Sequence, residues 1–423
     1  MQSKPILKIL IYISFLVSIV FTKDNDLEYI FDYFSNGIPS DDPNDYIIDY
    51  DTNYFPQLDS MVYWLIPDGE IPIDVKPLKS NNNVAIEFYH NRIFVAFRSS
   101  SSHFANSYTK MIILSTKDGK KWEKENVIEI DNDVREPLFA KINGRLMFYY
   151  FKAGNSSIKF EPTYVYMKER IGKGEWSKEK KVSNIKSRVF WNIKNRNDKL
   201  YVSSYEGEHY KIFGKSDLKV RLLESIDGTH FSQISSDYQY IGGISEVAFE
   251  FDEGGNFWAI SRNEDGDGTG FGSHLIFADN NDISKWRIID ETNTIYMSPR
   301  MFRHGKDIYL IARRNKGFLP FGFMPKFFPT SIQRIFNWLK FTTSSKATSL
   351  YKINQKLQTI EYIFDFPSSG DTAFPSIRRL DADTFVIANY TSNINNKRRW
   401  WFWGQIRPTY IYFVKLKFEK NVE

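Results

Sequence analysis

The sequence predicts an all-β protein, a six-bladed β-propeller with a short helical insertion in the region of blades five and six. Two observations carry this prediction: aromatic residues that recur about every 54 positions, and six strand-like segments that recur with a similar period. The composition agrees with it, because Phe, Tyr and Trp make up 17% of the 423 residues and aromatic side chains favour strands.

The aromatic period begins at a turn. In STKDGKKW (Ser115–Trp122) an Asp-Gly pair separates the strand-like runs KMIIL and VIEI, which is typical of a tight hairpin. SIDGTHF (Ser225–Phe231) repeats the pattern. With two further aromatic residues the spacings are 54, 55 and 55, at positions Trp122, Trp176, Phe231 and Trp286. We expect these four side chains to occupy equivalent places in four successive blades.

The strand-like segments give a second, independent register. Each of them has a polar or glycine start followed by an apolar run, and another strand-like run precedes it. The six segments end at Arg98, Phe151, Tyr205, Arg262, Arg313 and Tyr390. Six repeats of three or four short strands predict a six-bladed propeller. A pair of β-sandwiches is the alternative, but a sandwich gives no reason for the period.

The two Asp-Gly turns resemble the Asp-box, or BNR repeat, of the sialidase superfamily. The tail SGDTAFPSIRRLDADTFVIANY, followed by WGQIRPTYIYFVKL, resembles the closing blade of secreted sialidase-like propellers. The resemblance covers about residues 80–418. It implies the six-bladed fold and a glycosidase activity, although fold alone does not fix function.

The N-terminal residues 1–22 are typical of a signal peptide, since Lys4 and Lys8 precede the apolar run Ile9–Phe21, which is short for a membrane span. An uncleaved anchor is the alternative. We therefore expect a secreted or lumenal protein. It has no cysteine and hence no disulfide, and its glycosylation acceptors are Asn155 and Asn389.

Residues 23–76 form an acidic and aromatic segment, in which MVYWLIP (Met61–Pro67) is expected to form a strand that closes the ring of blades. Residues 77–418 are expected to form the propeller, with an insertion at 314–347.

The propeller prediction also indicates which residues meet. The starts of the innermost strands and the ends of the next strands converge on one mouth of the central channel. The starts contribute Glu136, Glu246, Arg300 and Asp371, and the ends contribute Arg98, Tyr205, Arg262, Arg313 and Tyr390. Charged residues are seldom buried unless paired, so this set predicts a polar pocket. Structural salt bridges around the channel are the alternative.

Cleavage of a glycosidic bond suits this set, because it needs a carboxylic acid and a second group as base or nucleophile. The candidate catalytic residues are Glu246, Glu136, Asp371 and Tyr390. The resemblance to sialidases implies Tyr390 as nucleophile with Glu246 as its base. It also implies an arginine grip on an acidic sugar, formed by Arg98, Arg262 and Arg313. Arg300 and Tyr205 are further candidates for substrate binding.

Two loops at the mouth contain further candidate residues for sugar binding and metal binding. In NKRRWWFWGQ, Trp401 and Trp403 are expected to stack on sugar faces, or alternatively to pack between the first and last blades. In NEDGDGTGFG, Asp265 and Asp267 are weak candidates for a Ca²⁺ site, against a flexible glycine-rich loop. No other cofactor or metal is expected.

The insertion 314–347 contains an expected amphipathic helix, with Ile332, Ile335, Phe336 and Leu339 on one face. All its charged residues are basic. A lid over the mouth is the first interpretation, because the insertion follows a mouth-facing strand end. A membrane-surface contact through 317–341 and a partner site are the alternatives.

The predicted function is that of a sialidase-like glycoside hydrolase that removes a polar or acidic terminal sugar. The alternative is a catalytically inactive propeller that binds glycans or a protein. The expected partner is a carbohydrate or glycoconjugate. A net charge of only +5 argues against nucleic-acid binding. The sequence does not indicate an oligomeric state.

Overall fold

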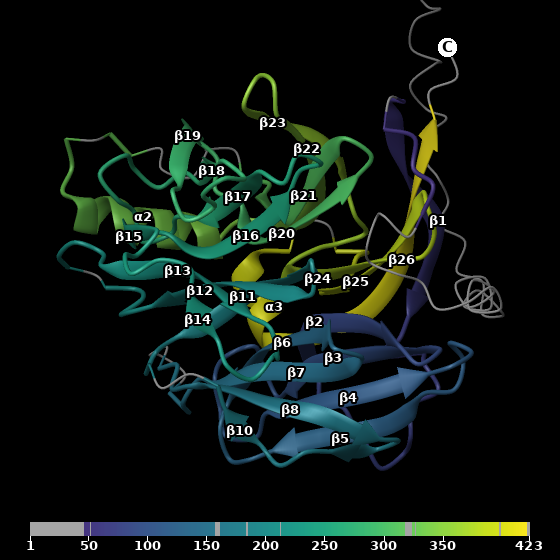
Figure 1. Cartoon of the computed structure of the whole chain (residues 1–423). Helices are drawn as coiled ribbons and strands as arrows, with labels where there is room; N and C mark the ends of the chain where they lie inside the picture. The colour runs from purple at the N-terminus through teal and green to yellow at the C-terminus, as the bar shows by residue number, and fades with distance from the viewer. Residues whose placement is uncertain are drawn as a thin grey trace, which may run out of the picture.

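The computed structural model describes residues 46–50, 52–156, 161–182, 185–211, 213–317, 324–325, 327–396 and 399–420. The predicted signal peptide lies outside these residues. Six antiparallel sheets form a ring, and their innermost strands gather around one centre (Figure 1). The predicted six-bladed β-propeller is therefore confirmed. In the described part of the chain, no helix has the length and apolar character that crossing a membrane requires.

Each of the first three blades runs outward from the centre in chain order. The first contains β2 (Ser80–Tyr89), β3 (Arg92–Ser100), β4 (Lys110–Thr116) and β5 (Glu123–Glu129). The second contains β6 (Val134–Ile142), β7 (Arg145–Lys152), β8 (Val165–Gly172), β9 (Glu175–Trp176) and β10 (Lys180–Lys181). The third contains β11 (Val189–Arg196), β12 (Lys199–Glu206), β13 (Leu218–Ser225), β14 (Ser232–Gln233) and β15 (Tyr240–Gly242).

The next two blades follow the same plan. The fourth contains β16 (Ser245–Phe251), β17 (Phe257–Arg262), β18 (His274–Ala278) and β19 (Arg287–Glu291). The fifth contains β20 (Met297–His304), β21 (Asp307–Asn315), β22 (Lys346–Asn354) and β23 (Thr359–Asp365). The six segments that set the strand register in the sequence are the second strands of the six blades.

The sixth blade joins the two ends of the propeller. It contains β24 (Thr372–Arg379), β25 (Thr384–Thr391), β26 (Tyr410–Lys420) and, as its outermost strand, β1 (Tyr54–Trp64). β1 pairs antiparallel with β26, from Tyr54 opposite Lys420 to Trp64 opposite Tyr412. An early strand thus covers the edge of the last blade, which closes the ring (Figure 1).

The two Asp-Gly turns have the same local structure. The backbone amides of Gly119 and Gly228 each donate to the hydroxyl oxygen three residues earlier, on Thr116 and Ser225, at 2.9 Å. Both glycines have a positive φ, of 71° and 72°, which other residues adopt at a cost. The turns are therefore structural, and they lie at the end of the blades opposite the mouth.

The four recurring aromatic side chains pack within or between blades. Trp122 stacks on Phe413 of the sixth blade, with ring centroids 5.9 Å apart. Phe231 packs on Phe190 of its own blade and on Tyr149 of the second. Trp176 and Trp286 pack on Phe148 and Phe257, within clusters that join neighbouring blades. This packing gives a physical reason for the period.

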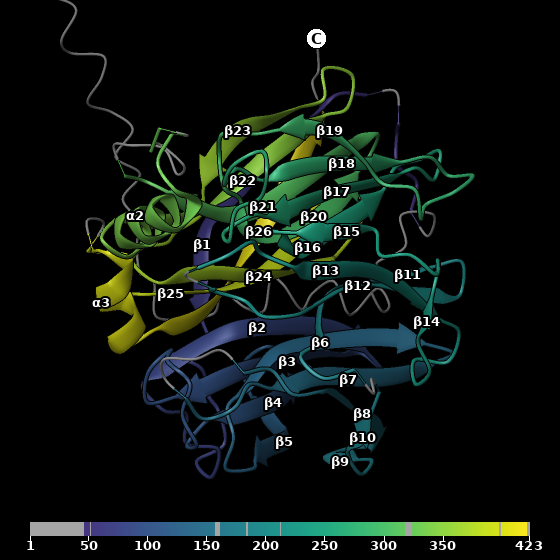
Figure 2. The same cartoon turned by 90° about the vertical axis from the view of Figure 1, so that its left-hand side faces the viewer.

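Two helices lie beside each other on the mouth side (Figure 2). α2 (Thr330–Thr342) belongs to the connection between β21 and β22, which spans residues 316–345. α3 (Trp401–Ile406) belongs to the connection between β25 and β26. Phe341 of α2 contacts Trp401 of α3, with ring centroids 4.9 Å apart, so the helices support each other.

Candidate active site at the channel mouth

A β-bulge near the start of each innermost strand shapes the mouth. The pairing register shifts in all six blades, between Asn82/Val84, Arg135/Leu138, Phe190/Asn192, Ser245/Ala248, Met297/Arg300 and Ala373/Ser376. Five bulges hold a residue at φ of 48–57°, namely Asn83, Glu136, Glu246, Ser298 and Phe374. Bulges re-aim side chains, and strained backbone is frequent at functional sites. The sequence places a carboxylate in two of these five positions.

Glu246 is held in place by two donors. One of its oxygens accepts a hydrogen bond from Arg262 on the neighbouring strand β17, and the other accepts from the backbone amide of Ser298 at 2.9 Å. A guanidinium and an amide N–H can only donate, so Glu246 accepts both bonds as a carboxylate. Arg262 also contacts Glu264. Glu246 and Arg262 thus lie next to each other, as the sequence predicts.

Glu136 occupies the equivalent bulge two blades earlier. Its Oε1 accepts a hydrogen bond from Asn83 Nδ2 at 2.8 Å. Burial and the nearby charge of Glu246 raise the pKa of Glu136 to about 7. Burial lowers the pKa of the Arg300 guanidinium to about 10, although the charges of Glu136 and Glu246 act in the opposite direction. The mouth therefore holds two carboxyl groups of different character, one readily protonated and one ion-paired.

Aromatic side chains close the channel below these groups. Trp191 of the third blade and Phe374 of the sixth meet with ring centroids 5.5 Å apart. Trp191 Nε1 donates to the Pro299 carbonyl at 3.2 Å, and Arg300 lies over its ring at 4.2 Å. Beyond this point the channel opens toward the other face, into a cavity of about 630 Å³ with charged walls that include Lys141, Lys194, Glu250 and Arg303.

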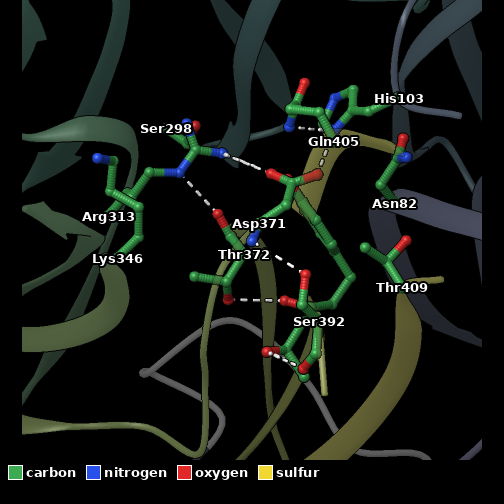
Figure 3. A network of polar contacts seen from close by, with 12 residues as sticks. Asn82, His103, Ser298, Arg313, Lys346, Asp371, Thr372, Ser392, Gln405 and Thr409 are labelled. Atoms are coloured by element: carbon green, nitrogen blue, oxygen red, sulfur yellow. Dashed lines mark hydrogen bonds and ion pairs between the residues drawn. The ribbon is translucent and has the colours of Figure 1, made fainter. Parts of the chain in front are cut away.

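A second polar cluster lies at the same mouth, centred on Asp371 (Figure 3). Asp371 precedes β24, and its two oxygens bind different partners. Oδ1 accepts from the Tyr390 hydroxyl at 3.0 Å, and Oδ2 lies 2.5 Å from His103 Nδ1. Arg313 Nη2 approaches the Tyr390 hydroxyl at 3.3 Å and Asp371 at 3.9 Å. Gln405 of α3 contacts the same His103 nitrogen at 3.1 Å.

The protonation states of this cluster follow from burial. Burial and the charge of Asp371 raise the pKa of Tyr390 well above its usual value, so the phenol stays neutral. Burial lowers the pKa of His103, so its imidazole is neutral at pH 7 and donates Nδ1–H to Asp371. Burial would raise the pKa of Asp371, but His103, Arg313 and Tyr390 overcome this effect and lower it.

The expected pairing of Tyr390 with Glu246 is wrong. Tyr390 binds Asp371 and Arg313 across blades five and six, whereas Glu246 binds Arg262 and Ser298 across blades four and five. The two side chains therefore have no hydrogen-bond partner in common.

The expected arginine grip is wrong as well. Arg98 is completely buried, and its guanidinium is occupied by Asp133 at 2.7 Å and by the carbonyls of Ser102 and Phe104. Arg262 and Arg313 lie in different clusters. Arg98 is therefore a structural residue, and the three side chains have no common point where they all meet a ligand.

The loop after β12 connects helix α2 to the Glu246 cluster. Tyr210 accepts a hydrogen bond from Arg262 Nη2 at 2.9 Å and packs edge-on against Trp338 of α2. Arg334 of α2 donates to the Asp265 carbonyl at 2.8 Å and to the Lys211 carbonyl. Helix α2 thus lies against the mouth loops.

Other predicted residues have mainly structural surroundings. Tyr205 is buried near Glu246, and burial with that charge raises the pKa of its phenol. Asp265 pairs with His209 at 2.8 Å, and Asp267 accepts from His274 and Tyr240. Among the described residues, no group of three or more His, Asp or Glu side chains has a metal-binding arrangement.

The remaining candidates differ in exposure. Trp401 is half-buried against Phe341, whereas Trp403 is exposed. Asn155 is exposed on a turn, but Ser157 of its acceptor motif lies outside the described residues. Asn389 is completely buried, and its Nδ2 donates to Thr348 at 3.0 Å and to Tyr412 at 2.9 Å. A glycan on Asn389 is incompatible with this packing, which corrects that expectation.

Sequence reasoning missed several groups at the mouth. His103 and Tyr210 lie on irregular connections and Gln405 lies in the short helix α3, where strand periodicity gives no information. Arg135 immediately precedes Glu136 and donates to Asp133 at 2.5 Å and to the His103 carbonyl at 3.0 Å. Its position directly before Glu136 was the only signal in the sequence, and the bulge that brings both side chains to the same side is visible only in the structure. The sequence did not single out Trp191, because this residue lies within an apolar run.

The fold defines the class of protein, a six-bladed β-propeller. The chain is similar to the sialidase of Trypanosoma rangeli, with a TM-score of 0.54 and 11% identity, over 85% of this chain and 59% of the sialidase chain. It is also similar to a protein of unknown function from Dyadobacter fermentans DSM 18053, with a TM-score of 0.55 and 12% identity, over 80% and 95% of the two chains.

These similarities concern the fold. No protein-family model matches the sequence, and no curated protein matches it. The chain spans only about 59% of the length of the sialidase it matches. At such low identities, the residues at the mouth have to be judged by their own chemistry.

Proposed function

We propose that the protein is a glycoside hydrolase whose reaction takes place at the mouth that holds Glu136 and Glu246. The observation that carries the proposal is the contrast between these carboxyl groups. Glu136 has a pKa of about 7, raised by burial and by Glu246, while Glu246 is held as a carboxylate by Arg262 and Ser298. A carboxylic acid close to an ion-paired carboxylate can serve as the acid and the base of glycoside hydrolysis.

In this proposal Glu136 is the general acid. Its proton passes to the glycosidic oxygen as the bond to the sugar breaks, which makes the leaving group a neutral alcohol. Glu246 acts on the other side of the sugar ring. It either attacks the anomeric carbon directly or removes a proton from the attacking water, depending on how far apart the two carboxyl groups lie in the complex.

The charge of the mouth supports a polar or acidic terminal sugar as substrate. Arg135 and Arg300 are largely but not completely buried, and a guanidinium group suits bidentate contacts to carboxylates or hydroxyl groups. One sialidase structure with this fold is a complex with the inhibitor DANA, and another is a covalent intermediate with a difluorosialic acid. This fold therefore accommodates an acidic sugar in a related protein.

The proposal gives Asp371 and Tyr390 a positioning role. Both side chains are completely buried, and the phenol stays neutral because burial raises its pKa. A neutral, hydrogen-bonded phenol is a poor nucleophile. Their hydrogen bonds to His103 and Arg313 connect blades five and six to the first mouth loop, and so stabilise the mouth.

A second candidate function is a catalytically inactive propeller that binds glycans or a protein. The burial of the carboxylates at the mouth favours this binding function, because Glu246 is only 3% exposed and Asp371 is not exposed at all. A substrate then needs an opening of the lid before it can reach the carboxylates, whereas a binding partner needs only the outer loops.

Secretion and glycosylation at Asn155 also remain proposals. Peptide mapping of protein secreted from a eukaryotic host tests both, since it identifies the mature N-terminus and any modified asparagine.

A hydrolysis screen tests the proposed function. The wild-type protein is incubated with chromogenic α- and β-glycosides, including sialosides and uronides, beside a Glu136→Gln, Glu246→Gln double variant. The proposal predicts turnover of at least one acidic or polar glycoside by the wild type alone. Binding of glycans without turnover, measured by calorimetry, would support the second candidate.

A further inference from the structure

The helix α2 is turned with its apolar side away from the propeller. Its buried residues are Gln333, Arg334, Asn337 and Phe341. Of the four residues on the predicted apolar face, Ile332 is 45%, Ile335 40% and Leu339 60% exposed, while Phe336 is partly buried. The polar side of α2 is bound to the propeller, because Arg334 donates a hydrogen bond to the Asp265 carbonyl at 2.8 Å. The outward position of the apolar side is therefore part of the fold.

Exposed aromatic residues gather on the same side of the molecule. Nine aromatic side chains are exposed among the described residues, and seven of them lie on connections at the mouth. The seven are Tyr108, Tyr210, Phe213, Phe327, Trp400, Phe402 and Trp403. Trp400, Phe402 and Trp403 lie on or next to α3, which contacts α2 through Trp401 and Phe341 (Figure 2). Soluble proteins rarely collect so many exposed aromatic groups on one side without a partner.

The two connections that contain α2 and α3 carry only positive charges. Residues 316–345 contain four basic residues and residues 392–409 contain four more, and neither connection contains an aspartate or glutamate. The whole chain, by contrast, is nearly balanced, with 56 basic and 51 acidic residues. Lys340 directly follows Leu339, Arg399 precedes Trp400, and Arg407 follows α3. Basic groups thus flank the exposed apolar ones.

We propose that α2 and α3 form a surface that binds an anionic lipid bilayer. Helices that lie in a membrane interface combine outward apolar and aromatic residues with flanking Lys and Arg. Anionic headgroups attract the basic residues, and the apolar side chains enter the boundary of the acyl region. The absence of acidic residues from both connections fits this occupant, since any carboxylate would be repelled by the headgroups. The inference does not depend on the proposed hydrolase activity.

Site-specific labelling tests this surface, because the chain has no cysteine. One variant carries Leu339→Cys on α2, and a matched control carries Leu357→Cys on the turn between β22 and β23, at the other end of the same blade. Leu339 is 60% exposed and Leu357 is 67% exposed, and each lies next to a lysine. Both full-length variants are labelled with the polarity-sensitive fluorophore NBD. They are mixed with vesicles of phosphatidylcholine alone or with 30% phosphatidylserine.

The proposal predicts a blue shift and an increase of NBD emission at position 339 with the phosphatidylserine vesicles only, and no change at position 357. It is overturned if neither label responds, as for a surface that binds a protein. It is also overturned if both labels respond alike, which would place membrane contact elsewhere on the chain. An equal response to both vesicle types would contradict the role of charge.

A charge variant adds a second readout. Lys340→Gln with Arg407→Gln, in the chain labelled at position 339, is expected to weaken binding to the anionic vesicles by roughly fivefold for each basic residue removed, which corresponds to about 1 kcal/mol per basic residue near an anionic surface. An unchanged affinity would contradict the proposal.

Discussion

Trp191 and Phe374 meet inside the central channel, with ring centroids 5.5 Å apart, although they come from the third and the sixth blade. Trp191 is almost completely buried, and Arg300 covers its ring. The contact separates the polar mouth from the cavity of about 630 Å³ on the other face. A substrate that reaches Glu136 and Glu246 therefore has to enter from the side of α2 and α3.

The first prediction concerns this contact. Trp191→Ala should lower the free energy of unfolding by about 3–5 kcal/mol, because it removes a large buried side chain and leaves a cavity. Trp191→Phe keeps most of the contact with Phe374 and should lower it much less. Urea denaturation of both variants measures the difference. Equal stability of Trp191→Ala and wild type would contradict the closed channel.

The second prediction concerns the pKa of Glu136. It is about 7 in the folded protein, compared with 4.5 for a free glutamate. Below pH 4.5 the carboxyl group is protonated in both states and does not affect stability. As the pH rises to 7, the unfolded chain releases the proton more readily, so the folded wild type loses stability by about 3 kcal/mol.

Glu136→Gln cannot ionise, so it serves as the reference for this effect. Relative to wild type, the variant should gain stability between pH 4.5 and pH 7, and the gain should then stay constant. Urea denaturation at several pH values measures the difference. Parallel stability curves for the two proteins would show that Glu136 has an ordinary pKa.

The third prediction assigns a reaction role to Glu246. Glu246→Gln keeps the shape of the side chain but removes its charge, and should reduce turnover by roughly 10²–10⁴-fold, the range of general acid–base catalysis. Glu264→Gln is the matched control, because it removes the other carboxylate that contacts Arg262. The control should keep its turnover within about tenfold. If both variants lose turnover equally, the charge of Arg262 is what matters, and Glu246 has no role of its own.

The fourth prediction separates this account from a mechanism with a tyrosine nucleophile. Tyr390→Phe removes the hydroxyl that binds Asp371 and Arg313. It should lower the free energy of unfolding by about 1–2 kcal/mol, the cost of unpaired buried partners, and leave turnover within about tenfold of wild type. A complete loss of turnover in a variant that remains folded would instead make Tyr390 the nucleophile.

The fold could be predicted because its signals are local and repeated. The 54–55-residue period reflects aromatic side chains that pack between blades, such as Trp122 on Phe413. The polar composition of the mouth was also accessible, because strand starts and ends share one face of a propeller. The bulges that position Glu136 and Glu246 could not be read from the sequence, since Asn, Ser and Phe occupy the same position in other blades.

The choice of partners could not be predicted. Which carboxylate Tyr390 binds depends on how the blades are arranged in space. Asp371 belongs to the same blade as Tyr390 and also binds the loop residue His103 through its other oxygen, whereas Glu246 belongs to blade four. The orientation of α2 could not be predicted from the sequence either. Its periodicity indicates an apolar side at Ile332, Ile335 and Leu339, but does not tell which side faces the propeller. The contacts of Arg334 and Phe341 with the mouth determine that.

The pH dependence of hydrolysis tests the central claim most directly. With a substrate from the glycoside screen, kcat/KM of the wild type should fall as the pH rises above about 7, because Glu136 has to be protonated to act as the acid. In Glu136→Gln this alkaline limb should disappear and the remaining rate should be low. A wild-type rate without an alkaline limb near pH 7, or a Glu136→Gln variant with the same profile as wild type, would contradict the account.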